Sequence, residues 1–305
     1  MVTADIQWLL FNGDLRENSN VMNFMEEDTL LIVGNGFDLG IGFKTSYKDF
    51  MDSSYFPNPN ESGLSEYLVS VRDKNFGWVD IENELATYSK KLEDMNNCGL
   101  EGSYREYSEK FRFEYELLKN GLRNYLKILT SQRMTLKSDN QSKRILDRLE
   151  GNHRIVTFNY TDTIERLTHG GYSSQKGNLL HIHGSLESDD DIVFGVDDFA
   201  ELPKEHVFLY KAYSPSKKTC EFSQWLSEAD KIIFYGYSLG DTDKQYFVKF
   251  FQELCKGSDN EKELVFYYYN RDAYDNLKWQ LQQFTNHNLS RLEMYNHVKF
   301  LDCNL

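Results

Sequence analysis

Short apolar runs separated by polar turns fill the chain after residue 151, and one such run stands alone near the start, at residues 29–33. Residues 30–33 are apolar without interruption, as is typical of a strand covered on both faces of a parallel sheet. The later runs predict strands at 154–158, 179–182, 192–194, 231–235, 264–269 and 298–301, with helices at 161–168, 220–228, 242–255 and 271–284. This alternation predicts an α/β fold with a doubly wound, mostly parallel, Rossmann-like sheet.

Between the first strand and residue 150 the pattern changes to helical spacing. Apolar residues recur every three or four positions in 78–96 and in 104–130, which predicts long amphipathic helices with core-facing stripes. We therefore expect one α/β domain over residues 29–305, with a large helical insertion at about 55–150. The preceding residues, 1–28, form an N-terminal extension, either partly ordered or an arm that packs on another subunit.

Composition narrows the class of protein. The 305 residues carry a formal net charge of −14, which repels phosphate backbones, and no Lys/Arg-rich run offsets it, so nucleic-acid binding is not expected. The four cysteines are far apart and form no C-x-x-C pair, so neither a metal site nor a disulfide framework is expected. The N-terminal apolar stretch is too short for a signal peptide or a membrane span, which predicts a cytoplasmic protein without a membrane partner.

Glycines and polar residues follow five of the predicted strands. They are Gly34-Asn35-Gly36, Asn159, His183-Gly184-Ser185, Gly236-Tyr237-Ser238 and Asn270. Open α/β sheets bind ligands outside the carboxyl ends of their strands, so these residues predict a site at one edge of the sheet. The paired glycines after the first strand allow backbone N–H groups to approach a phosphate. A dinucleotide-binding dehydrogenase would need a third glycine where Leu39 stands, which disfavours that class.

Several motifs resemble a known family. G-N-G-F-D at 34–38 and T-S-Y-K-D-F at 45–50 resemble the opening of the bacterial abortive-infection AbiH family, and W-V-D-I-E at 78–82 is similar to it as well. That family in turn resembles sirtuin-like NAD-binding proteins. The resemblance implies a sirtuin-like α/β domain, NAD as the ligand and a role in antiviral defence. We also expect either a homo-oligomer or a partner protein of a defence system.

The resemblance assigns roles to individual residues. Asn159, in N-Y-T-D, matches the asparagine near the nicotinamide ribose, and His183, in H-I-H-G-S, matches the general base. A histidine suits this task because its ordinary pKa near 6.5 lets it accept a proton at neutral pH. The expected NAD-binding residues are Gly34, Asn35, Gly36, Asp38, Gly236, Ser238 and Asn270. Asp38 either binds a ribose hydroxyl or caps the turn that follows it.

The chain lacks the zinc-binding cysteine pairs of protein-deacylating sirtuins, which leaves water as the natural acceptor for the ribose carbon. The resemblance therefore implies an NAD⁺ glycohydrolase that acts in abortive infection by NAD depletion. Two alternatives remain open. One is a non-catalytic sensor that binds NAD or ADP-ribose, and the other is a structural subunit of a defence complex whose polar residues only terminate strands.

Overall fold

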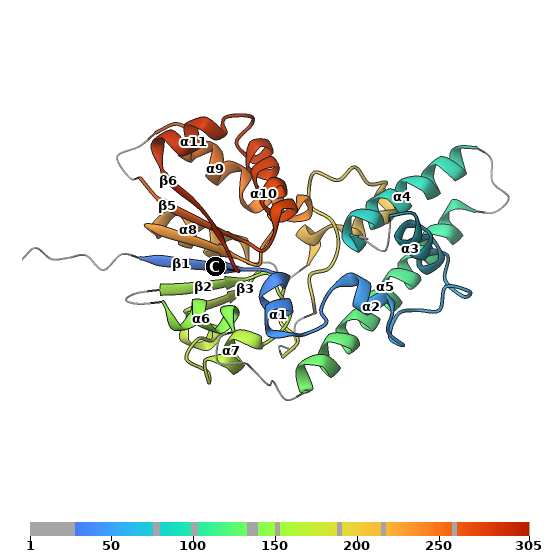
Figure 1. Ribbon diagram of the computed structural model, residues 1–305. Coiled ribbons are helices and arrows are strands. Elements are labelled where there is room, and N and C mark those ends of the chain that lie inside the picture. The colour runs from blue at the N-terminus through green and yellow to red at the C-terminus, as the bar shows by residue number, and fades with distance from the viewer. Residues whose placement is uncertain are drawn as a thin grey trace, which may run out of the picture.

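The structure is a computed structural model that describes residues 28–75, 80–98, 103–132, 140–149, 153–187, 191–214, 218–257 and 261–304. A six-stranded sheet lies at its centre (Figure 1). The strands are β1 (Thr29–Val33), β2 (His153–Thr157), β3 (Leu179–His181), β4 (Lys231–Tyr235), β5 (Glu263–Tyr268) and β6 (His297–Asp302). Their order is β3-β2-β1-β4-β5-β6 and every pair is parallel, which confirms the predicted Rossmann-like sheet.

Strand β1 occupies the middle of the sheet because its side chains can be buried on both faces. Leu30 to Val33 are completely buried, and β1 pairs with β2 on one side and β4 on the other. Val33 is level with Thr157 and with Tyr235, so the three strands end at the same edge. The strand order reverses between β1 and β4, and in such folds this point is where ligands bind.

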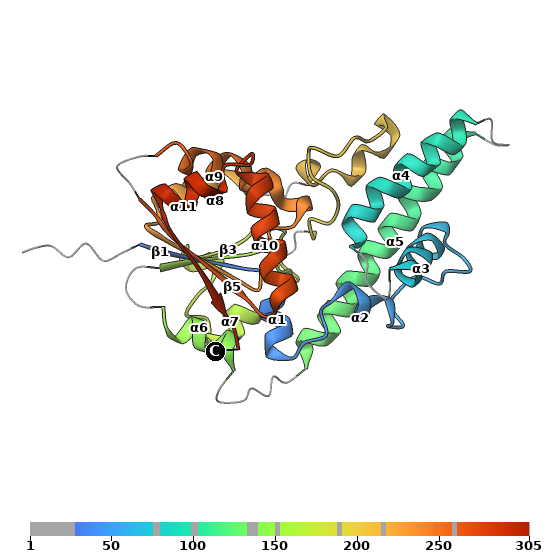
Figure 2. The same cartoon turned by 45° about the horizontal axis from the view of Figure 1, so that its top comes forward.

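Helices cover both faces of the sheet (Figure 2). On one face lie α8 (Thr219–Glu228), α9 (Val248–Leu254), α10 (Arg271–Phe284) and α11 (Leu289–Tyr295), which bury side chains in one core cluster. On the other face lie α1 (Asn35–Ile41), α6 (Gln141–Asp147) and α7 (Thr163–Leu167), with a second cluster. The result is the three-layer, doubly wound arrangement that the sequence predicts.

Between β1 and β2, all the regular elements that the structure describes are helices. A separate group is formed by α2 (Tyr47–Met51), α3 (Gly63–Lys74), α4 (Ile81–Asn97) and α5 (Tyr104–Ser131). The predicted stripe of α5, which includes Phe111, Tyr115 and Leu118, is buried in this group's own core. That core also takes in residues that follow β3, such as Phe194 and Leu209, so the segment after β3 joins the helical group to the sheet.

Two predicted elements differ from the structure. Residues 192–194 form no strand, because Ile192 and Phe194 are buried in the core of the helical group and the nearest pairing is an isolated bridge between Val196 and Tyr210. The helix predicted at 242–255 begins as a 3₁₀ turn, Asp241–Tyr246, and continues as α9. Three further 3₁₀ turns are Ser174–Lys176, Lys204–Leu209 and Lys211–Tyr213.

The N-terminal extension cannot be compared with its prediction, because residues 1–27 lie outside the described ranges. Trp78, of the predicted stripe of the earlier helix, lies outside them too. None of the helices that the structure describes is long and apolar enough to cross a membrane.

Candidate functional site

The glycines after β1 and β4 pack the two loops against each other at the point where the strand order reverses. The N–H of Gly36 donates to the Gly236 carbonyl at 2.8 Å, and the N–H of Gly34 donates to the Tyr235 carbonyl at 3.3 Å. A Cβ on Gly36 would lie 2.6 Å from the Gly236 Cα, and Gly236 itself has a φ of 62°. The close approach that requires these glycines is therefore between two backbones, and the Gly36 N–H expected to cradle a diphosphate is bonded within the protein.

Gly36→Ala should destabilise the fold by about 1–3 kcal/mol, because the new methyl group meets main-chain atoms that cannot move aside. Gly240→Ala is the matched control. Gly240 has a φ of −60°, and the nearest atoms to its added Cβ are 4.0 Å away, so this change should be neutral or slightly stabilising. Thermal melting of both variants tests the expectation, and equal melting temperatures would contradict it.

Asn159 links the end of β2 to the same glycine turn. Its side-chain Nδ2 donates to the Gly34 carbonyl at 3.1 Å, and its backbone N–H donates to the Thr157 hydroxyl at 3.1 Å. The residue is almost completely buried. Asn159 therefore holds the turn after β1 in place from the neighbouring strand, and the structure brings this predicted residue together with Gly34.

His183 lies in the turn after β3 and is only 3% exposed. Its Nε2 is 3.1 Å from Oδ1 of Asp243, and the rings of Phe158, Tyr160 and Tyr246 surround the imidazole. Asp243 belongs to the G-Y-S-L-G-D-T-D segment after β4. A histidine from the end of one strand and a carboxylate from the loop after another thus form a buried pair.

A buried lysine, Lys211, connects Asp243 of this pair to the helical group. Lys211 Nζ donates to Asp243 Oδ1 at 2.9 Å, to Glu82 Oε2 at 3.2 Å and to the Thr242 carbonyl at 3.3 Å. Glu82 comes from the first turn of α4. The Tyr237 hydroxyl donates to the second oxygen of Asp243 at 3.2 Å. We call His183, Asp243, Lys211 and Glu82 the charged network; it joins the segments after β3 and β4 to the helical group.

Opposite charges within the charged network offset the effect of burial on the pKa values of Asp243 and Lys211. Burial alone would raise the pKa of Asp243, but the Lys211 ammonium and the His183 imidazole hold that pKa below its usual value. Burial would likewise lower the pKa of Lys211, but Asp243 and Glu82 raise it above its usual value. Both groups therefore stay charged at neutral pH. A carboxylate next to an imidazole is also found beside the histidine of known general-base sites, and here the two groups are 3.1 Å apart.

Asp38 is buried on α1, and its Oδ2 accepts a hydrogen bond of 2.6 Å from the Thr161 hydroxyl. Burial raises the pKa of Asp38 from 3.8 to about 6. The C-terminal turn of α1 is closed by backbone N–H groups that donate to main-chain carbonyls, the Asp38 carbonyl among them, while the side chain reaches across to the loop after β2.

Asp38→Asn should stabilise the protein at pH 7 by up to about 3 kcal/mol, the equivalent of two pKa units. Because the folded-state pKa is raised, the contribution of Asp38 to stability is fully present below pH 4 and is lost as the pH rises through 6. The gain in melting temperature should therefore shrink to nothing at pH 4. A variant less stable than wild type at pH 7 would show that the Asp38 carboxylate is held by a favourable interaction.

The remaining predicted residues lie on the surface of this edge. Asn35 is exposed; its side-chain Nδ2 donates to the Thr45 backbone carbonyl, and its Oδ1 accepts from the Thr45 hydroxyl. Ser238 is exposed in the loop after β4. Asn270 is exposed and caps α10, where its side chain accepts a hydrogen bond of 2.8 Å from the Ala273 N–H. The structure thus brings Gly34, Gly36, Gly236 and Asn159 together, and leaves Ser238 and Asn270 at the rim.

Sequence reasoning missed two members of the charged network. Asp243 lies five residues beyond the Gly236-Tyr237-Ser238 turn, and neither it nor Lys211 is among the residues that the sequence predicts for the site. A single lysine inside the aromatic stretch F-L-Y-K-A-Y is the available signal, since a lysine among core residues needs carboxylate partners. Glu82 belongs to the W-V-D-I-E motif, and the structure places its carboxylate 3.2 Å from the Lys211 ammonium.

No described residues form a group of three or more histidine, cysteine or acidic side chains suited to a metal ion. Cys98 and Cys220 are exposed free thiols, and Cys255 is a buried one. The charged network itself contains an imidazole, two carboxylates and a buried ammonium.

Six parallel strands in this order, with helices on both faces, define a Rossmann-like α/β protein, and a histidine–aspartate pair lies at the ends of its strands. The family model for bacteriophage abortive infection AbiH matches residues 30–268, so the chain belongs to the AbiH family. The match runs from β1 to the end of β5 and includes the whole charged network. Membership implies a role in abortive infection of phage-infected bacteria, as predicted. No curated protein matches the chain.

Proposed function

We propose that this chain is an NAD⁺ glycohydrolase that releases nicotinamide and ADP-ribose, and that it acts in abortive infection by depleting NAD. The observation that carries the proposal is the position of His183. Its Nε2 lies 3.1 Å from Asp243, at the sheet edge where Rossmann-like proteins bind dinucleotides.

Hydrolysis of the nicotinamide–ribose bond requires a general base for the attacking water and residues that position the ribose. The bond from the ribose carbon to the nicotinamide nitrogen breaks, and its electron pair leaves with nicotinamide. Water forms the new bond to that carbon and gives its proton to His183. His183 Nε2 lies 3.1 Å from the Asp243 carboxylate, so Nδ1 is the ring atom that we assign as the proton acceptor. Asn159, held against the Gly34 carbonyl, would place its amide oxygen on the water.

The network supplies the orientation that a base requires. Lys211 and Tyr237 hold both oxygens of Asp243, so the carboxylate that supports His183 cannot rotate away. Because these groups are buried and hydrogen-bonded before substrate arrives, little reorganisation is needed during the reaction. This preorganisation favours an enzyme over a subunit whose polar residues only close strands.

One observation favours the sensor as the second candidate. His183 is 3% exposed and surrounded by aromatic rings, so substrate reaches it only after the segments around it move. A protein that binds NAD or ADP-ribose at the outer rim, without turnover, would leave this arrangement closed. The same closure is expected of a hydrolase that is harmful to its host and is held inactive until triggered.

The test measures nicotinamide release from NAD⁺ by chromatography, with purified protein and with cells expressing it before and after phage infection. The glycohydrolase predicts nicotinamide and ADP-ribose in equal amounts and a fall of cellular NAD on infection. Stabilisation against melting by NAD or ADP-ribose, with no product in either setting, would assign the sensor instead. If NAD⁺ gives no product and neither ligand raises the melting temperature, the structural subunit is the remaining hypothesis.

A further inference from the structure

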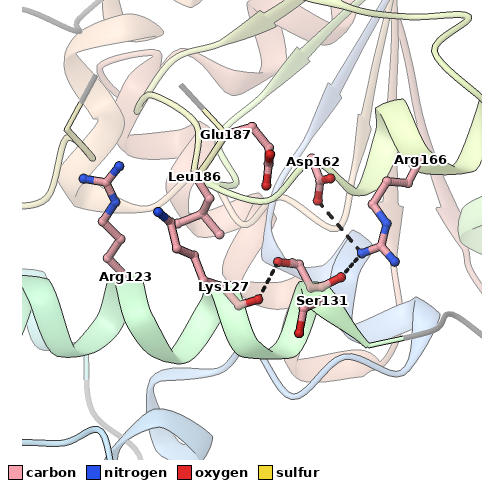
Figure 3. A pocket seen from close by; sticks show the side chains of 8 residues that line it. Arg123, Lys127, Ser131, Asp162, Arg166, Leu186 and Glu187 are labelled. Atoms are coloured by element: carbon pink, nitrogen blue, oxygen red, sulfur yellow. Dashed lines mark hydrogen bonds and ion pairs between the residues drawn. The ribbon is translucent and has the colours of Figure 1, made fainter. Parts of the chain in front are cut away.

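A pocket of about 600 Å³ opens between the C-terminal part of α5 and the start of α7, below the loop that follows β3 (Figure 3). Its volume lies in the range of small-molecule sites. The aromatic residues around His183 do not line it, and neither does any member of the charged network. The pocket is therefore separate from the proposed catalytic site, although Leu186 and Glu187 come from the same loop as His183.

Three cationic side chains line this pocket. Arg123 and Lys127 are four residues apart on α5, and both point from the helix toward the loop that carries Leu186, while Arg166 reaches in from α7 (Figure 3). The chain as a whole has a net charge of −14, and Arg123 Nη1 also lies 3.7 Å from Asp191, but cations outnumber carboxylates in the lining of this pocket. Cations that converge on one polar cavity attract an anionic group.

Arg166 contacts the C-terminal end of α5, next to the pocket. It donates hydrogen bonds to the Thr130 carbonyl and, at 3.0 Å, to the Gln132 carbonyl, and its Nη1 lies 4.0 Å from Asp162. These carbonyls close the C-terminal end of α5, where the helix dipole is negative and would repel an anion. The guanidinium offsets that dipole, and it is held in place by the same contacts.

Two carboxylates complete the lining. Asp162 lies beside Arg166, and Glu187 is exposed at the rim (Figure 3). Carboxylates accept hydrogen bonds from hydroxyl groups but repel phosphate, so a ligand that satisfies the whole pocket presents phosphate to the cations and hydroxyls to the acids. The lining is mostly polar, which disfavours an apolar ligand.

We propose that this pocket binds a small sugar phosphate, with its phosphate between Arg123 and Lys127 and its hydroxyl groups on Asp162 and Glu187. The site is independent of the proposed hydrolase activity, because binding to it requires no turnover and no movement around His183. It gives the protein a second ligand of its own, between the helical group and the sheet.

Calorimetric titration of the full chain with ribose 5-phosphate tests this assignment. Lys127→Gln and Arg123→Gln should each weaken binding roughly 10- to 100-fold, the loss expected for a hydrogen bond to a charged group. Arg105→Gln is the matched control, because Arg105 is an exposed arginine at the far end of the same helix. Its affinity should equal that of the wild-type protein.

A second titration with inorganic phosphate tests the hydroxyl part of the site. The wild-type protein should bind ribose 5-phosphate more tightly than phosphate, and Glu187→Ala should reduce this preference while phosphate itself binds more tightly. No binding of ribose 5-phosphate, or binding that both cation variants leave unchanged, would overturn the site. Equal affinity for the two probes would overturn the sugar part of the assignment.

Discussion

His183→Gln should lower the rate of nicotinamide release by about 10²–10⁴-fold, the usual contribution of a general base. Glutamine keeps a polar side chain beside Asp243 but cannot accept a proton from water. Binding of NAD should change far less than turnover, because the proposed contacts with the dinucleotide come from other residues. Nicotinamide release and NAD binding, measured on the same preparation, separate the two effects.

His181→Gln provides the matched control, two residues earlier in the chain. His181 lies in β3, and its Nε2 is 2.8 Å from the Glu165 carboxylate, so its expected role is structural. We expect near-normal turnover and some loss of stability. Asn159→Ala should resemble His183→Gln, and combining the two should add little if both act on one water. Full hydrolysis by His183→Gln, in protein free of contaminating hydrolase, would remove the base assignment.

Lys211→Met should lower the free energy of unfolding by about 3–5 kcal/mol, because it leaves Glu82 and Asp243 buried without their cation. For a domain of this size the melting temperature should fall by roughly 10 °C. Asp243, whose pKa is held below its usual value, contributes stability above its unfolded pKa that is lost as the pH falls. The difference between wild type and Lys211→Met should therefore shrink in acid.

Lys119→Met is the control for the loss of a lysine that pairs with two carboxylates. Lys119 contacts Glu116 and Asp191, but about half of each carboxylate side chain is exposed to solvent, so replacing Lys119 should cost about 0–1 kcal/mol. Adding Glu82→Gln and Asp243→Asn to Lys211→Met should restore part of the stability by removing the unpaired charges. If Lys211→Met and Lys119→Met have the same melting temperature, the charged network contributes no more to stability than a surface ion pair does.

The strands with uninterrupted apolar runs were predictable because burial on both faces leaves a simple pattern. Residues 231–235 were predicted with their bounds, as was α10. Residues 192–194 have the same composition but pack into the helical group, and local sequence does not distinguish a strand from a buried irregular segment. The two long helices of the insertion, α4 and α5, followed from spacing alone because their stripes face one core, whereas the shorter α2 and α3 were not predicted.

Only those candidate site residues that directly follow a strand could be predicted from the sequence. The rule that ligands lie at the carboxyl ends of parallel strands selected Gly34, Asn159 and His183. It could not show which side chain supports the histidine, because the pairs His183–Asp243 and Glu82–Lys211 join segments far apart in the chain. The glycines show the same limit, since a sequence does not reveal whether the close neighbour of Gly36 is a ligand or Gly236.

The central position of β1 also affects how the chain folds as it is synthesised. Thr29 pairs with His153 and with Lys231, so both neighbours of the first strand come from segments on the order of 100 to 200 residues later in the chain. Closing such long loops slows folding. Until β4 leaves the ribosome, an apolar strand has at least one unpaired edge, which is an aggregation hazard. His183 likewise lacks its carboxylate partner until Asp243 emerges, so the nascent chain carries no assembled site.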